Sequence, residues 1–312
     1  MNDGARAVVV GIDIIDADMA ALRWAVAEAA LREAPLRIVH SYSRTQDRQF
    51  TTATRLAAVD ASPAHARAES VLDAAARRCR LLSPQLLVSC VASEGTAAAV
   101  LLAEARQASL VVIGSRKLDA LGSLLLGSTG QAVAERAPCP VVVIGEQPPK
   151  NSAGGGRVVV GVNLDEDDST VLAFGFAQAR RHTAVLEVVV CWKPDLMSAA
   201  SLLYEAVAAE QATVEDLLDD RLTPWRERFP DVQVSQVVLE QRPVAGLVAR
   251  AAGQRLLVVG RRGIHPLQAP LLGAVNLGVL HRSQCPVAIV PTVAADAGHP
   301  HSVRSLGRQP TS

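Results

Sequence analysis

The sequence predicts an α/β protein built from two tandem, doubly wound domains. Short runs of β-branched residues alternate with stretches rich in Ala, Leu and Arg at helical spacing, as in β-α-β units on a parallel sheet. Hydrophobic residues make up 49% of the chain and aromatic residues only 3%, so the core is built from small aliphatic side chains. This composition favours helices packed on parallel strands over an all-β sandwich.

An internal repeat supports the count of two domains. The segment "GSRKLDALGSLLLGSTG" begins at residue 114, and "GRRGIHPLQAPLLGAVN" begins at residue 260. Four residues recur at a spacing of 146, with Gly114, Gly127, Cys139 and Pro140 returning as Gly260, Gly273, Cys285 and Pro286. A chain of 312 residues is long enough for two hydrophobic cores.

The first half is expected to contain five strands and four helices. Apolar β-branched runs predict strands at 7–12, 36–41, 86–92, 109–114 and 140–145, and helical periodicity predicts helices at 17–33, 62–81, 96–107 and 128–137. In the first of these helices Ala21, Leu22, Ala25, Val26 and Ala29 form one stripe, which should lie on the sheet. Asp16 or Asp18 is placed to cap it.

The second half repeats this order of elements. Strands are predicted at 157–162, 185–192, 232–239, 255–260 and 286–291, and the longest helix at 199–228. The Pro, Gly and polar residues of 147–156 predict a linker between domains at 1–146 and 157–292. Residues 293–312 lack periodicity and are expected to be a disordered tail.

Charge and cysteine usage exclude several classes of function. The 31 basic and 31 acidic residues are interspersed, so neither a nucleic-acid face nor a polybasic membrane contact is expected. No apolar run approaches the roughly 20 residues of a membrane span, and the start "MNDGARAVVVGID" lacks a signal-peptide core. The five cysteines include no CxxC pair, which favours reduced, buried thiols and a cytoplasmic protein.

The repeated loop is the candidate binding element. In open parallel sheets, ligands bind beyond the carboxyl ends of the strands, where the strand order reverses. The strand at 109–114 runs into a loop that ends at Gly127 and Ser128, which begin a helix. Helix N-terminal N–H groups bind phosphate, and glycine lets the ligand approach closely, so this loop predicts an anion site. Ser128 is expected both to cap the helix and to contact the phosphate.

Three segments carry a family resemblance. The pattern Gly, two residues, Gly, nine residues, Gly-Ser/Thr, which both loops approach, together with the preceding "VVIGS" or "VVGRR" and the following "CPV", is typical of one family. "VVVGIDIIDADMAALRWAVAEA" and "VASEGTAAAVLLAEARQASLVVIGSR" are similar to its first strand and helix and to the approach to its fourth strand. Nearly all of both halves thus resembles the universal stress protein family, in the tandem form abundant in actinobacteria.

The resemblance implies a fold, a ligand and an assembly. Each domain should hold a five-stranded parallel sheet in the order 3-2-1-4-5 with helices on both faces, like the adenine-nucleotide α-hydrolases. ATP, with or without Mg²⁺, would bind at the ends of strands one and four. The strands at 140–145 and 286–291 would face each other in an intrachain pseudo-dimer, which removes two open edges, and two chains would associate again as a homodimer.

The resemblance also implies the binding residues of the first domain. Asp13 matches the acidic position near the adenine, although it could instead cap the turn after the strand. Ser41 matches the position at the end of strand two. The phosphate loop matches Gly114, Gly127, Ser128, Thr129 and Gly130. Lys117 stands at the second loop glycine, where its Cβ would crowd the phosphates or its ammonium would pair with them.

The second domain departs from the family pattern at other positions. Gly260, Gly263 and Gly273 complete the loop glycines, but Asn163 replaces the acidic residue and Ala274 the hydroxyl residue. Asn276 could partly substitute for the lost hydroxyl, and Cys191 stands at the position of Ser41. Arg261 and Arg262 either contact phosphate or are solvated, and Arg180, Arg181 and His182 are interpreted as a solvated helix end.

Three functional hypotheses follow. The leading one is a cytoplasmic stress-response module that binds an adenine nucleotide and acts through conformation or an unknown protein partner. The departures at Lys117, Asn163 and Ala274 favour the second, a degenerate scaffold that binds no nucleotide and works through protein contacts. The third, a slow ATPase or phosphate-transferring enzyme, is weakened because no nucleophile–base pair and no GxSxG, HExxH or GxxxxGK[ST] motif is present.

Overall fold

The computed structural model describes residues 6–13, 18–43, 63–115, 127–145, 156–192, 203–261 and 272–292. The first half comprises β1 (Val8–Gly11), α1 (Met19–Leu31), β2 (Leu36–Tyr42), α2 (Pro63–Leu82), β3 (Val88–Glu94), α3 (Ala97–Ala105), β4 (Leu110–Gly114), α4 (Ser128–Arg136) and β5 (Val141–Ile144). The second comprises β6 (Val158–Val162), α5 (Ser169–Arg181), β7 (Leu186–Trp192), α6 (Leu203–Arg228), β8 (Val234–Glu240), α7 (Pro243–Ala251), β9 (Leu256–Arg261), α8 (Ala274–Arg282) and β10 (Val287–Pro291). The predicted α/β class is confirmed. The predicted linker, apart from its last residue, and the predicted tail lie outside the described residues.

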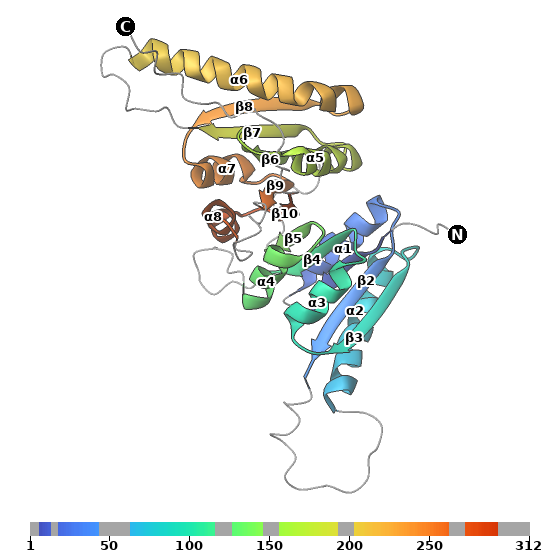
Figure 1. The fold of residues 1–312 in the computed structure, drawn as a ribbon. Coiled ribbons are helices and arrows are strands. Elements are labelled where there is room, and N and C mark those ends of the chain that lie inside the picture. Colours follow the sequence, from blue (N-terminus) through green and yellow to red (C-terminus); the bar gives the residue numbers. More distant parts are fainter. Residues whose placement is uncertain are drawn as a thin grey trace, which may run out of the picture.

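The strands form one continuous sheet rather than two separate ones. Its order is β3-β2-β1-β4-β5-β10-β9-β6-β7-β8, so each half has the expected order 3-2-1-4-5, and the halves merge into ten strands (Figure 1). All pairings are parallel except the central one, where β5 and β10 run antiparallel with Val142 opposite Ala288. Because the order reads the same from both edges, the halves are related by an approximate two-fold axis between these strands.

Each face of the sheet carries a core that runs through both halves. Successive strand residues point to opposite faces, so Val8 and Val10 belong to one core and Val9 to the other. The first core packs under α1, α2, α5 and α6, and the second under α3, α4, α7 and α8. The inner strands consist largely of buried valines, leucines and isoleucines, as expected for a sheet covered on both faces, whereas the edge strands β3 and β8 are partly exposed. Each core therefore contains buried apolar side chains from both halves of the chain.

One polar contact joins the halves on the first face. The side chain of Glu28 in α1 is 1% exposed, and its Oε2 lies 3.0 Å from His182 Nε2, at the end of α5. Its Oε1 lies 2.6 Å from Nε of Arg32. Burial by itself would raise the pKa of Glu28, but the His182 hydrogen bond and the Arg32 charge outweigh it and hold the pKa at about 2. The expectation that His182 belongs to a solvated helix end was wrong, because the two-fold arrangement buries that end against α1.

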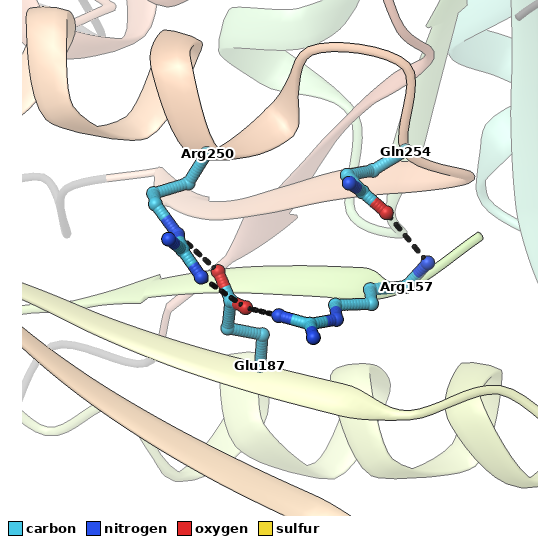
Figure 2. Close-up of polar contacts among 4 residues, drawn as sticks. All are labelled: Arg157, Glu187, Arg250 and Gln254. Atoms are coloured by element: carbon cyan, nitrogen blue, oxygen red, sulfur yellow. Dashed lines mark hydrogen bonds and ion pairs between the residues drawn. The ribbon is translucent and has the colours of Figure 1, made fainter.

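A second buried charge cluster stiffens the second half. Glu187 on β7 is 1% exposed and accepts two hydrogen bonds of 2.6 Å from Arg250 on α7, and it also pairs with Arg157 (Figure 2). Gln254 holds the backbone N–H of Arg157 at 2.9 Å. The same positions of the first half carry the opposite charges, since Arg37 on β2 pairs with Glu104 on α3 at 2.8 Å. The repeat thus preserves a strand-to-helix ion pair while inverting its sign.

Candidate functional site

The first candidate site is a cavity of about 430 Å³ beyond the carboxyl ends of β1 and β4. Seven of the eight residues proposed for the first domain line it: Asp13, Ser41, Gly114, Gly127, Ser128, Thr129 and Gly130. Lys117 lies outside the described residues. Apolar side chains from β2, α3, β4 and the residue after β1 form a further wall: Ile12, Val39, Val100, Leu101 and Ile113. The cavity therefore has one apolar wall and one polar end, and its volume falls within the usual range of ligand pockets.

The polar end is the first turn of α4. The first helical hydrogen bond runs from Gln131 N–H to Gly127 C=O, so the N–H groups of Ser128, Thr129 and Gly130 have no acceptor within the helix. The N-cap is Gly127, without a side-chain cap. Ser128 was expected to be that cap, and this was wrong because the helix begins at Ser128 itself, one residue earlier than capping by Ser128 requires. Its hydroxyl is left beside the cavity, together with three backbone donors.

A buried carboxylate that the sequence analysis did not assign to the site also lines this cavity. Asp18 is 8% exposed and stands at the N-cap of α1, but it makes no side-chain cap bond there. Its Oδ2 instead accepts the backbone N–H of Asp13 at 2.7 Å, which fixes the turn after β1. A Cβ on Gly114 would lie 2.5 Å from Asp18 Oδ1, so glycine at 114 is what admits the carboxylate. Asp13 itself is exposed at the mouth of the cavity.

The second candidate site is a smaller cavity of about 230 Å³ beyond the ends of β6 and β9. Four proposed residues line it: Asn163, Gly260, Gly273 and Asn276. Gly263 lies outside the described residues. Asn276 is 4% exposed, and its Nδ2 donates to the carbonyl oxygen of Gly260 at 3.0 Å. The amide that was expected to replace a phosphate-binding hydroxyl therefore ties α8 to the end of β9.

Asp168 in this second cavity repeats the arrangement of Asp18. It is 5% exposed at the N-cap of α5, and its Oδ2 accepts the backbone N–H of Asn163 at 2.6 Å. Burial raises the pKa of Asp168 to about 7, against a smaller opposing effect of that hydrogen bond. The recurrence of Asp at the same helix start in both halves was the sequence signal that could have identified the pair.

Cys191 and Arg261 complete the comparison between the two halves. Cys191 lines the second cavity at the position of Ser41, and burial raises the pKa of its thiol, so the thiol is protonated at neutral pH. Arg261 was expected to contact phosphate or to be solvated, and both expectations were wrong. Its Nη1 donates to the carbonyl oxygens of Ala137 at 2.8 Å and Ala134 at 3.4 Å, at the end of α4 in the other half. Arg262 lies outside the described residues.

Neither a metal-binding cluster nor a membrane-spanning helix is present among the described residues. No group of three His, Cys, Asp or Glu side chains among them is arranged to hold a metal ion. None of the helices described is both long and apolar enough to cross a membrane. Cys79, Cys139 and Cys285 are buried free thiols as expected, whereas Cys90 is exposed on the edge strand β3.

Comparison with known proteins gives consistent matches over both halves. The profile of the universal stress protein family matches residues 4–145 and 156–291. A universal stress protein of Mycobacterium tuberculosis is 32% identical over 308 residues, which covers 90% of this chain and 96% of the relative. One from Mycolicibacterium smegmatis is 28% identical over 290 residues, with 91% and 96% covered.

Solved structures share the fold at lower identity. A universal stress protein from Archaeoglobus fulgidus aligns with a TM-score of 0.64 and 15% identity, covering 91% of this chain and 96% of that one. A protein from Pseudomonas aeruginosa, described as functionally unknown, aligns with a TM-score of 0.62 and 14% identity, covering 92% and 93%. At such identities the likeness concerns the fold alone.

Proposed function

Because the chain belongs to the universal stress protein family, we propose that it is a cytoplasmic stress-response protein that binds an adenine nucleotide in the first cavity. The observation that carries this proposal is the convergence of an apolar wall and the open first turn of α4 on one cavity. We propose one domain at residues 1–146 and another at 157–292, and the two ranges matched by the family profile support this division.

The residues of the first cavity suit the parts of a nucleotide. The N–H groups of Ser128, Thr129 and Gly130, with the dipole of α4, would hold the phosphates. Val39, Val100 and Leu101 would pack on the adenine. Asp13 would lie near the base and Ser41 at the side of the cavity. In this proposal, bound ATP acts as the signal. Its Mg²⁺ would be coordinated by the phosphates rather than by a cluster of protein ligands.

The second cavity favours a different role for the second half. It is about half the volume of the first, and Ala274 at the start of α8 offers no hydroxyl where α4 has Ser128. These features favour, for this half alone, the alternative of a degenerate unit that binds no nucleotide and acts through protein contacts. We therefore expect one ATP per chain, bound in the first half.

A charge at the start of α4 tests the proposal. Ser128→Asp places a carboxylate at the N-terminus of the helix, which stabilises the helix but repels phosphate. We expect its ATP affinity, measured by calorimetry with Mg-ATP, to fall by about tenfold or more, while adenosine affinity stays the same. Ala274→Asp, at the same place in α8, is the control and should bind ATP like wild type.

Release of ligand from the purified protein gives the second measurement. Denatured protein should free about one adenine nucleotide per chain if the first cavity is filled in the cell. Absence of released nucleotide, together with no heat on addition of Mg-ATP, would refute nucleotide binding and leave the scaffold as the function.

A further inference from the structure

We propose that Arg261 is a positioning residue that couples the two cavities, because it holds the phosphate-binding helix of the first half from the edge of the second cavity. This inference rests on the proposed function for its ligand. Arg261 ends β9, and its neighbour Gly260 lines the second cavity. Its guanidinium crosses the junction to α4, whose first turn lines the first cavity.

The contact is made at the end of α4 where a cation is most effective. Ala134 and Ala137 belong to the last turn and the C-cap, where carbonyl oxygens have no N–H partner within the helix. Nη1 of Arg261 donates to both of these oxygens, at 3.4 and 2.8 Å. A cation at a helix C-terminus also interacts favourably with the helix dipole. The first half itself contributes Arg136, whose Nε donates to the carbonyl oxygen of Ala132 at 3.4 Å, and the second half adds a cap on the two carbonyl oxygens beyond it.

The length of α4 makes this external cap important. Ser128–Arg136 is nine residues, and isolated helices of that length are marginal in water. Its position depends on packing through Val133 and Ala134 and on its two ends. A small shift of the last turn moves the first turn as well, because the helix between them is rigid. The geometry of the three phosphate-facing N–H groups is therefore sensitive to Arg261.

The link continues from Arg261 into the second cavity. The carbonyl oxygen of Gly260 accepts the Asn276 amide from the first turn of α8, and Thr292 bonds to the carbonyl oxygen of Arg261. A ligand or a substitution that moves Asn276 changes the end of β9 and with it the guanidinium. The path from one cavity to the other therefore runs from α8 through Asn276, Gly260 and Arg261 to α4.

Among the residues that the structure describes, the link is seen once in the repeat. The position of Arg261 is occupied in the first half by Ser115, directly after β4, and a serine offers no guanidinium to the end of α8. At this pair of positions in the described part of the chain, a side chain of the second half holds a helix of the first half. The resulting free-energy coupling is nevertheless reciprocal, so ATP in the first cavity would also alter binding in the second.

Hydrogen exchange of the ligand-free chain gives the first test. Arg261→Ala should increase the exchange of the hydrogen-bonded α4 amides at 131–137 by about tenfold over wild type, because the last turn loses its cap. Arg282→Ala, which removes an exposed arginine at the end of α8, is the matched control and should leave these amides unchanged. Unchanged exchange in Arg261→Ala would overturn the inference whether or not the protein binds ATP.

A double-mutant cycle with Mg-ATP gives the second test. Arg261→Ala should weaken ATP binding by about tenfold and leave adenosine binding unchanged, and Arg261→Lys should restore part of the loss. Asn276→Ala should alter ATP affinity in the wild-type background and have little effect in Arg261→Ala. Additive effects of the two substitutions would overturn the coupling. If wild type binds no ATP, the proposed function fails, and the exchange experiment still decides whether Arg261 positions α4.

Discussion

Glu28 in α1 and His182 at the end of α5 pair across the junction, with Oε2 and Nε2 3.0 Å apart. The two-fold arrangement brings the same two positions together a second time, with other residues. Gln178 holds in α5 the place that Glu28 holds in α1, and Arg32 holds the place of His182. Gln178 is fully buried, and within the described residues neither polar atom of its side chain has a partner. The ionic link between α1 and α5 is thus made on one side of the axis only.

Acid should weaken the protein through Glu28. Its pKa of about 2 in the folded protein lies below the ordinary value of 4.5, because the His182 and Arg32 contacts outweigh burial. A lowered pKa adds stability above pH 4.5, and this stability is lost as the pH falls from about 4.5 towards 2. The difference corresponds to about 3 kcal/mol of unfolding free energy. Urea unfolding of wild type and Glu28→Gln between pH 6 and 3 measures it, and the two curves should converge as the pH falls. Parallel curves would contradict the assignment.

Breaking the Glu187 cluster should cost more than breaking an exposed ion pair. Glu187→Gln leaves the guanidiniums of Arg157 and Arg250, which are 43% and 37% exposed, without a carboxylate, and we expect a loss of about 2 kcal/mol in unfolding free energy as the charged hydrogen bonds are lost. Asp219→Asn breaks the pair with Arg226, whose side chains are 52% and 36% exposed, and should cost less than about 1 kcal/mol. Equal losses in urea unfolding would show that burial does not set the strength of the cluster.

A charge at the central strand pair should separate or unfold the halves. Val142 is fully buried on β5 opposite Ala288 of β10. Val142→Lys buries an unpaired ammonium there, and we expect destabilisation by more than about 4 kcal/mol with an increased hydrodynamic radius. Ser89→Lys, on the exposed edge strand β3, is the control. Gel filtration and thermal unfolding indistinguishable from wild type would refute the role of this strand pair. We also predict that two chains associate into a homodimer, and the hydrodynamic radius of wild type in the same gel-filtration experiment tests this.

The elements were predictable because local patterns determine them. Runs such as Val8–Gly11 and Leu110–Gly114 are apolar on both faces, as strands covered by helices must be, and the repeat showed that the second half has the same order. The family resemblance pointed to Asp13 and Ser41, and these residues lie with the start of α4 because strand ends of a parallel sheet share one edge.

Contacts that depend on the two-fold axis were not predictable from local patterns. From the sequence, His182 and Arg261 were interpreted as solvated charges. The surfaces that cover them, α1 and the end of α4, come from the other half of the chain. The merged sheet and these contacts follow from the antiparallel pairing of β5 with β10. Asp18 was interpreted from the sequence as a helix cap. A capping carboxylate and a pocket-lining carboxylate occupy the same position in the sequence, and only the direction of the side chain in three dimensions distinguishes the two roles.

Asp168 should make the second half less stable as the pH rises. Burial lifts its pKa to about 7 from an ordinary value of 3.8, so between these values the folded protein holds a proton that the unfolded chain has released. Stability therefore falls as the pH rises from about 4 to 7, by up to about 4 kcal/mol.

Asp168→Asn removes this dependence and keeps an oxygen that can accept the N–H of Asn163. We expect the variant to be more stable than wild type at pH 8, with the advantage vanishing near pH 4. Asp165→Asn, at an exposed carboxylate in the same loop, is the control and should follow wild type at all pH values. Because the amide of Asn carries no negative charge to repel phosphate, Asp168→Asn should also raise any ATP affinity of the second cavity at pH 8, measured by calorimetry. A variant no more stable than wild type at pH 8 would show that the carboxylate of Asp168 is compensated in the folded protein.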